Sequence, residues 1–195
     1  MIGNKKWIYK NYDEALVESL CNEYDLPHLT ASVLQNRTDV VGGFTRKPTF
    51  QEKFYDPFLL RDMDKAVERI KNALYKNEKI TIYGDYDADG VTSTSVLYLY
   101  LKEKGACVNY YIPDRIDEGY GVNVAALDKI KAEGTKLIVT VDTGIAAADE
   151  IEYAKNLGID VVVTDHHECK SSIPDCVAVV DPKRPDCPYP YKELA

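Results

Sequence analysis

The sequence predicts an α/β fold in which a mostly parallel, doubly wound sheet follows a helical N-terminal segment. From residue 79 onward, short apolar runs alternate with helical stretches, whereas the first 78 residues lack strand-like alternation. The hydrophobic share of 45% and the charged share of 29% are those of a folded globular chain. We therefore expect a helical lead-in at residues 1–78 and an α/β domain at residues 79–195.

Apolar residues in the lead-in recur at helical spacing around residues 12–24, 30–37 and 62–75. In the last stretch, four of them follow at steps of three and four and would line one helix face: Met63, Val67, Ile70 and Leu74. Glycine and proline recur within residues 38–57, which predicts a long connection there.

The α/β part repeats a unit of strand, loop and helix. The expected strands are residues 80–83, 107–112, 137–141, 160–164 and 177–180. The expected helices are residues 91–104, 122–132 and 146–156. Helices of this length between strands indicate right-handed crossovers, so the strands should run parallel with both faces of the sheet covered.

Composition narrows the function classes. The net charge of −8 opposes nonspecific attraction to phosphate backbones, so any contact with nucleic acid has to be local or assisted by metal. The five cysteines form no CxxC pair, which argues against a disulfide framework and a zinc ribbon. No apolar run approaches the roughly 20 residues that span a bilayer, and the N-terminus has no signal-peptide core. We therefore expect a cytoplasmic protein with no membrane partner.

Acidic motifs follow three of the expected strands. Ligands of open parallel sheets gather at the carboxyl ends of the strands, so these motifs should face one crevice. They supply Asp85, Asp87 and Asp89 in GDYDADG, Asp142 in VDTG, and Asp165, His166 and His167 in TDHH. Clustered carboxylates repel one another, and a mixed Asp/His set suits Mn²⁺ or Mg²⁺. Two ions bridged by Asp142 would fit phosphoryl chemistry.

Each motif also has a plainer interpretation. GDYDADG resembles the opening of an EF-hand loop, although a strand precedes it and no Glu stands six residues after Gly90. Alone, it could be a solvated turn. Asp142 could cap the helix near Ala146, and the two histidines could be one cap and one exposed imidazole. Three such motifs at successive strand ends favour the metal site.

The loop IPDRIDEGYG at residues 112–121 follows the second strand and should open on the same crevice. Arg115 there could hold a phosphate with two hydrogen bonds. In the alternative interpretation, Arg115 pairs with Asp117 or Glu118 and Tyr120 packs against the protein.

Together, GDYDADGVTST, IPDRIDEGYGVN, VDTGIAA and TDHHE resemble the DHH phosphoesterase superfamily and, within it, the RecJ single-strand-specific exonucleases. The resemblance extends over nearly the whole chain. It implies a DHH-type domain at residues 79–195 that is incomplete at its C-terminus, because RecJ proteins continue into a helix with another metal-ligand aspartate, a second lobe and an OB-type domain. We therefore expect these 195 residues to be a fragment with little exonuclease activity alone.

The resemblance also implies roles for single residues. Asp87, Asp89, Asp142 and His166 would bind two Mn²⁺ or Mg²⁺ ions, with Asp85 as an additional or outer ligand. Asp165 would orient the following imidazole, and His167 would polarise or protonate the substrate phosphate. We assign Arg115 and Tyr120 to substrate binding. The implied reaction is 5′-to-3′ release of mononucleotides from single-stranded DNA in repair and recombination, with repair and recombination proteins as partners.

Two other functions stay open. A DHH phosphodiesterase of short oligonucleotides or cyclic dinucleotides would agree with the net charge of −8. A catalytically silent DHH module could serve as a scaffold, although the intact set of Asp87, Asp89, Asp142 and His166 speaks against a decayed site.

Overall fold

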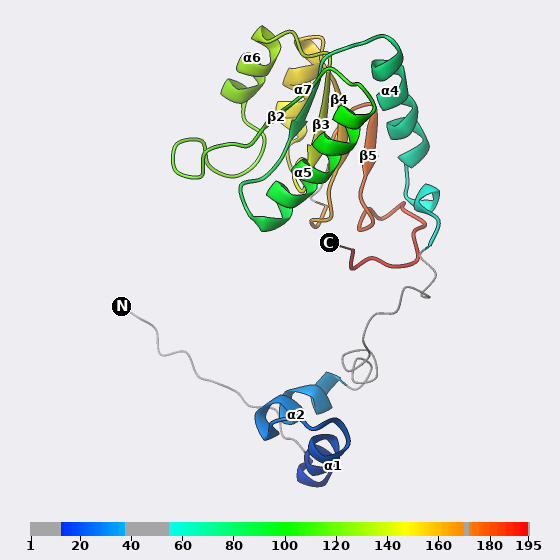
Figure 1. The fold of residues 1–195 in the computed structure, drawn as a ribbon, viewed down its shortest axis with the longest axis vertical. Coiled ribbons are helices and arrows are strands. Elements are labelled where there is room, and N and C mark those ends of the chain that lie inside the picture. Colours follow the sequence, from blue (N-terminus) through cyan, green and yellow to red (C-terminus); the bar gives the residue numbers. More distant parts are fainter. Residues whose placement is uncertain (1–12, 38–54, 170–171, 195) are drawn as a thin grey trace. The chain divides into compact units, whose positions relative to one another are not determined.

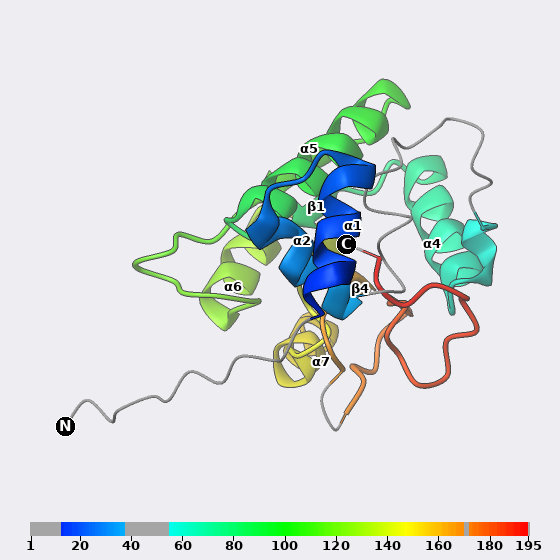
Figure 2. The same ribbon diagram turned by 90° about the horizontal axis from the view of Figure 1, so that it is seen from below.

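The structure, a computed structural model, describes residues 13–37, 55–169 and 172–194. The chain divides into two compact units, Met1–Phe54 and Tyr55–Ala195. Figure 1 shows the helices and strands of both units, and β1 is labelled in Figure 2.

In its described residues, the first unit is helical. α1 (Glu14–Tyr24) begins after Asp13, whose carboxylate accepts two backbone N–H groups of the first turn. α2 (His28–Leu34) passes directly into a 3-10 turn, η1 (Gln35–Arg37). The two helices bury a small apolar cluster of Val17, Leu20 and Ala31. Both helices predicted in this part of the sequence are therefore present.

Five strands of the second unit form one sheet in the order β2-β1-β3-β4-β5, and every neighbouring pair is parallel. The strands are β1 (Ile80–Tyr83), β2 (Val108–Tyr111), β3 (Leu137–Val141), β4 (Asp160–Thr164) and β5 (Ala178–Val180). The predicted parallel α/β sheet is confirmed, and each strand lies within an apolar run that predicted it.

Helices cover both faces of this sheet (Figures 1 and 2). α4 (Met63–Tyr75) and α5 (Ala88–Glu103) pack into the apolar core of one face. α6 (Val124–Ala132) and α7 (Ala148–Asn156) pack into the core of the other. The doubly wound arrangement is therefore confirmed. In the described ranges, no helix combines the length and the apolar character needed to cross a membrane.

Successive residues of the central strand β3 are buried on opposite faces. Leu137 and Val139 belong to the core beneath α4 and α5, and Ile138 belongs to the core beneath α6 and α7. Because both faces are covered, the strand LIVTV is apolar on both faces apart from Thr140, rather than alternating between apolar and polar residues.

The two central strands lead the chain in opposite directions along the sheet. β1 connects through α5 to β2 at one edge, whereas β3 connects through α7 to β4 on the other side. At such a switch point the loops after the two strands diverge and leave a crevice between them. The fold thus places the loop after β1 beside the loop after β3.

α4 packs against β5. A hydrogen bond also connects the start of α4 to the segment that follows β5. Arg184, which is 8% exposed, donates through Nη1 to Asp62 Oδ2 at 2.7 Å and to the Val179 carbonyl at 2.6 Å. Asp62 precedes α4 but pairs with Arg184 instead of capping that helix. α4 falls within the predicted helical lead-in at residues 1–78 but lies in the second unit, Tyr55–Ala195. A domain boundary at residue 78 stays a prediction.

Several element boundaries differ from the sequence-based expectation; α6 and α7, for example, each begin two residues later than predicted. Two of the differences have a common cause. α5 begins at Ala88 rather than at residue 91, because Asp87 Oδ1 accepts the first free N–H groups of the helix. Of the predicted connection at residues 38–57, residues 38–54 lie outside the described part of the chain. Its last residue, Pro57, begins a 3-10 turn, η2 (Pro57–Leu59). Asp56 caps that turn by accepting the N–H of Phe58. An aspartate cap therefore explains both differences.

Gly90 lies where α5 passes the loop after β1. A Cβ atom at this position would lie 2.7 Å from the Cα and from the carbonyl carbon of Asp85, and closer still to its carbonyl oxygen. These are backbone atoms, so no side-chain rotation could relieve the contact. The glycine is required by close packing, which holds Asp85 beside the start of α5.

We expect Gly90→Ala to lower the free energy of unfolding by about 2 kcal/mol, because the overlap with the Asp85 backbone exceeds the gain in helix propensity. Urea unfolding followed by circular dichroism measures the change. Ser95→Ala, on the exposed side of α5, is the matched control and should alter stability by less than about 0.5 kcal/mol. Equal stability of Gly90→Ala and wild type would show that the loop is not packed this closely.

Candidate metal centre

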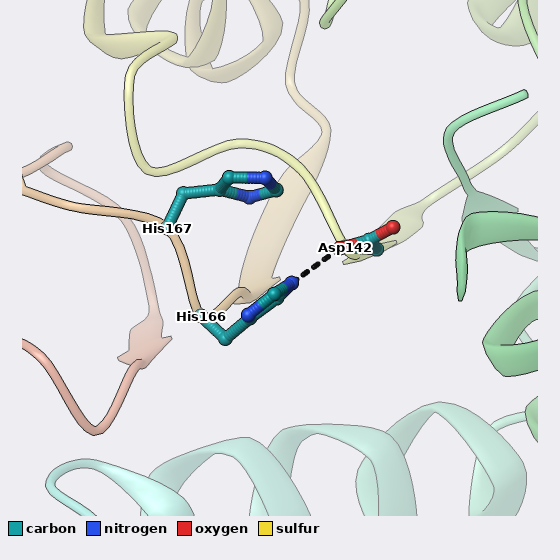
Figure 3. Close-up of side chains that lie close together, drawn as sticks. All are labelled: Asp142, His166 and His167. Atoms are coloured by element: carbon teal, nitrogen blue, oxygen red, sulfur yellow. Dashed lines mark hydrogen bonds and ion pairs between the residues drawn. The ribbon is translucent and has the colours of Figure 1, made fainter. Parts of the chain in front are cut away.

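The carboxyl ends of β1, β3 and β4 bring the acidic motifs together. β3 lies between β1 and β4 in the sheet. Asp85 and Asp87 follow β1, Asp142 follows β3, and Asp165, His166 and His167 follow β4. Figure 3 shows His166 reaching from the end of β4 to Asp142 at the end of β3.

Five of these side chains form two groups of possible metal ligands that share Asp142. Ligand atoms of Asp85, Asp87 and Asp142 lie within 4.8 Å of one another, and so do those of Asp142, His166 and His167. A carboxylate common to two ligand groups is what a bridged pair of divalent ions requires. The structure therefore brings together the three motifs that the sequence placed at one crevice.

Asp142 is held in an uncommon backbone conformation. Its φ of 59° lies in the left-handed region, which few non-glycine residues adopt and which is often found at functional sites. Its N–H donates to the Thr164 carbonyl, and its Oδ1 lies 2.8 Å from His166 Nε2. Burial raises the pKa of Asp142 and the charge of Asp87 adds to the rise, although the hydrogen bond with His166 opposes it. The side chain is thus fixed between the two ligand groups.

Asp85 and Asp87 differ in their hydrogen bonding. Asp87 caps α5, and the bond from the Gly90 N–H leads the effects that lower its pKa. Asp85 is 3% exposed, and its Oδ1 has no hydrogen-bond partner in the described residues. Burial raises the pKa of Asp85, and the charge of Asp87 raises it further. A buried, unpartnered carboxylate oxygen beside two other carboxylates fits a divalent cation well.

Asp165 holds the turn that carries both histidines. Its Oδ1 accepts the backbone N–H groups of His166 at 2.7 Å and His167 at 3.1 Å, and its Oδ2 accepts that of Ile145 at 2.9 Å. Oδ1 also lies 2.7 Å from His167 Nδ1. Burial lowers the pKa of His167, but the hydrogen bond and the charge of Asp165 outweigh burial, so the net shift is upward. His167 Nε2 is the ring nitrogen that Asp165 leaves available.

Asp89 belongs to neither ligand group, although it lines the same hollow as Asp142 and His166. As the second residue of α5, it is placed beyond the loop that carries Asp85 and Asp87. Of the seven predicted ligand and catalytic residues, five therefore lie in the two ligand groups, and Asp165 is hydrogen-bonded to one of them, His167. Asp89 lies at their margin.

Arg115 lies over the ring of Tyr86, with Cζ 5.5 Å from the ring centroid. Among the described residues, neither Asp117 nor Glu118 forms an ion pair with it; Glu118 instead accepts from the Tyr111 hydroxyl at 2.6 Å. The alternative pairing considered from the sequence is thus absent from the described part of the chain. Arg115 is exposed on the loop after β2.

Tyr120 stands beside the histidine pair. Its ring centroid is 6.2 Å from that of His167, and the side chain is 56% exposed. Burial of the hydroxyl, followed by the charges of Asp165 and Asp85, raises the pKa of Tyr120 to about 12. Tyr120 is therefore a neutral aromatic side chain at the open side of the site.

Two hollows flank the histidines. One of about 510 Å³ is lined by Asp142 and His166 together with Met63 of α4 and apolar residues of the segment after β5. The other, of about 470 Å³, is lined by His167, Tyr120 and the loop between β3 and α7. Both volumes are typical of small-ligand pockets.

Lys183 lies near the site although it is not among the predicted site residues. This residue lies in the turn after β5, and its Nζ is 3.4 Å from Glu168 Oε1, next to His167. Its position in the sequence could have indicated it: Lys183 follows an apolar run that forms a strand, as the predicted aspartate ligands do.

We expect Asp165→Asn to lower the pKa of His167, because the variant keeps an acceptor but loses the carboxylate charge that outweighs burial. An NMR titration of the His167 imidazole measures the shift. A raised pKa of His167 in the folded state stabilises the fold at pH values below the ordinary pKa of 6.5. This stabilisation disappears as the pH rises through the raised pKa. Asp165→Asn should therefore lose the stabilisation at low pH. Asp175→Asn, which removes an exposed partner of Lys155, is the control. An unchanged His167 titration in Asp165→Asn would contradict the assignment.

Comparison with known proteins agrees with this geometry. Residues 79–190 match the family model of the DHH family, N-terminal domain. The chain is 48% identical over 198 aligned positions to the single-stranded-DNA-specific exonuclease RecJ of Bacillus subtilis (strain 168), which covers 100% of this chain and 25% of that protein. It is 41% identical to the RecJ of Escherichia coli (strain K12), over 70% of this chain and 24% of that protein. The chain thus spans about a quarter of the length of these relatives.

Two solved structures have a similar fold. A crystal structure of exonuclease RecJ bound to manganese superposes with a TM-score of 0.62 at 36% identity, covering 68% of this chain and 34% of the other. The Mn²⁺ complex of RecJ from Thermus thermophilus gives a TM-score of 0.60 at 28% identity, covering 89% and 24%. With its motifs at the strand ends, its sheet and its match to the family model over residues 79–190, this chain belongs to the DHH family.

Proposed function

We propose that the chain is the DHH portion of a metal-dependent exonuclease that releases mononucleotides from the 5′ end of single-stranded DNA. The observation that carries the proposal is the sharing of Asp142 between two ligand groups. The relatives support the substrate class, since they are named single-stranded-DNA-specific exonucleases. Action in the cytoplasm, together with repair and recombination proteins, is part of the proposal.

Asp85, Asp87, Asp142 and His166 would hold two Mn²⁺ or Mg²⁺ ions, and Asp89 stays a predicted ligand at the margin. The mixture of carboxylate oxygens and imidazole suits these ions, and two similar RecJ structures contain manganese. When bound, the ions would lower the pKa of a water molecule and offset the charge on the attacking and leaving oxygens.

His167 would act directly on the substrate phosphate. Asp165 engages Nδ1 and fixes the ring, so Nε2 can polarise a phosphate oxygen or donate a proton to the leaving oxygen. Different partners support a division between a ligand, His166, and a substrate-facing imidazole, His167: His166 bonds to Asp142, and His167 bonds to Asp165.

Arg115 and Tyr120 would position the strand. The loop that carries them is anchored by Glu118, which accepts from the Tyr111 hydroxyl and from the Asp114 N–H. The planar guanidinium of Arg115 can hold a phosphate with two hydrogen bonds. The exposed ring of Tyr120 beside His167 can stack on a base or pack on a sugar.

A second candidate is a phosphodiesterase of short oligonucleotides or cyclic dinucleotides. The hollows of about 510 and 470 Å³ favour it, because each suits a small ligand better than a long strand. The preserved ligand groups speak against a third candidate, a silent scaffold module.

In the natural full-length protein, we expect Mn²⁺-dependent hydrolysis to begin at the 5′ end of single-stranded DNA. A 5′ label should leave at once as a mononucleotide, whereas a 3′ label should stay on progressively shorter strands. Duplex ends should resist, because paired bases do not present single bases for stacking. Asp142→Ala should abolish turnover, and Asp175→Asn, whose carboxylate pairs with Lys155 and belongs to neither ligand group, should retain it.

Two results would contradict this proposal. A strong preference for dinucleotides or cyclic dinucleotides over long strands would favour the second candidate. Undiminished digestion by Asp142→Ala would show that the shared carboxylate is not part of the active site.

A further inference from the structure

A lysine from the segment after β5 reaches the rim of the site. β4 and β5 are parallel neighbours, and the Asp165 N–H donates to the Val180 carbonyl at 3.1 Å, so the ends of the two strands adjoin. Three residues beyond Val180, Lys183 places its Nζ 3.4 Å from Oε1 of Glu168, which lines the hollow beside His167.

The turn that carries Lys183 is firmly held. The Lys183 N–H donates to Asp181 Oδ1 at 2.7 Å, and Asp181 is fully buried. The next residue, Arg184, is anchored to Asp62 and Asp186 through its guanidinium. The Lys183 side chain is 21% exposed, so most of its stem lies along the protein and its ammonium group has a restricted range.

The partner of Lys183 is weakly bound. The Glu168 side chain is 85% exposed, and the single N–O contact of 3.4 Å is long for an ion pair. Exposed pairs of this kind contribute little to stability and exchange readily with other partners. A phosphate offers more acceptor oxygens and can therefore displace the glutamate.

A strand entering the site meets the clustered carboxylates of Asp85, Asp87 and Asp142. The chain has a net charge of −8, and divalent ions at Asp142 would neutralise the phosphate that reacts but not its neighbours. Arg115 lies on the loop after β2, at one edge of the sheet, and Lys183 follows β5, at the other edge. The two cations thus stand on opposite sides of the strand ends that carry the acidic motifs.

We propose that Lys183 binds a phosphate of the single strand adjacent to the reacting one, and that Glu168 holds the lysine in place when no strand is bound. This inference rests on the proposed exonuclease function. It adds a substrate-contacting residue that stands outside the ligand groups and the histidine pair.

The test is steady-state hydrolysis of a 5′-phosphorylated oligothymidylate by the natural full-length protein with Mn²⁺, over a series of salt concentrations. Lys183→Gln should raise KM several-fold and leave kcat unchanged, because the contact is equally present before and during the reaction. The slope of log KM against log salt should fall by about 0.7, the loss of one phosphate contact on a single strand. Lys183→Arg should restore both values.

Glu168→Gln separates phosphate binding from a structural role. Removing the competing carboxylate should lower KM, the opposite of the effect of Lys183→Gln, whereas loss of a structural ion pair would not improve binding. Lys155→Gln is the matched control: it also breaks an exposed lysine–carboxylate pair, but from the C-terminal end of α7, and should change neither KM nor the slope.

The outcomes separate this inference from the proposed function. No hydrolysis of single strands by the wild type would overturn both. Hydrolysis by the wild type with Lys183→Gln indistinguishable from Lys155→Gln would overturn the inference alone. So would a loss of kcat that Lys183→Arg does not restore. If a thermal melt shows that Lys183→Gln does not fold, the Glu168→Gln variant tests the inference instead. An unchanged or raised KM of Glu168→Gln would then reject the phosphate contact.

Discussion

Repulsion between carboxylates held together in a crevice is the constraint on which the site depends. Asp85 and Asp142 are almost fully buried, and burial leads the effects that raise the pKa of each. Asp87 adds a third negative charge within ligand distance of both. A bound divalent cation would relieve this repulsion. The surrounding contacts hold the carboxylates in place: Asp87 caps α5, and Asp142 is fixed by its bonds to Thr164 and His166.

The order of the strands creates this cluster. β1 and β3 are neighbours in the sheet although β2 separates them in the sequence, and their connections leave toward opposite edges. The GDYDADG loop therefore meets the VDTG turn, and β4 adds the histidines from the other side of β3. If β2 lay between β1 and β3, one strand width of about 4.8 Å would be added between the two aspartate loops, and a shared carboxylate could not serve both groups.

Much of this arrangement could be predicted from the sequence, because apolar runs locate the strands and the residues just after them locate the site. The strand order could not be predicted, because the motifs do not indicate on which side of its strand each crossover connection places the next strand. α5 begins three residues before the expected start, because in the sequence alone Asp87 fits a loop residue as well as a helix cap. Some contacts form only when folding brings distant side chains together. Glu118 meets Tyr111 and Lys129 in this way. Lys183 likewise meets Glu168.

Anomalous diffraction from crystals of the natural full-length protein soaked in Mn²⁺ tests the central claim most directly. If Asp142 bridges two ions, the map should contain two manganese peaks about 3.5–4 Å apart, both in contact with its carboxylate. Asp85 and Asp87 should bind on one side and His166 on the other, as the two ligand groups indicate. A single ion that does not touch Asp142, or two ions with no common ligand, would contradict the account.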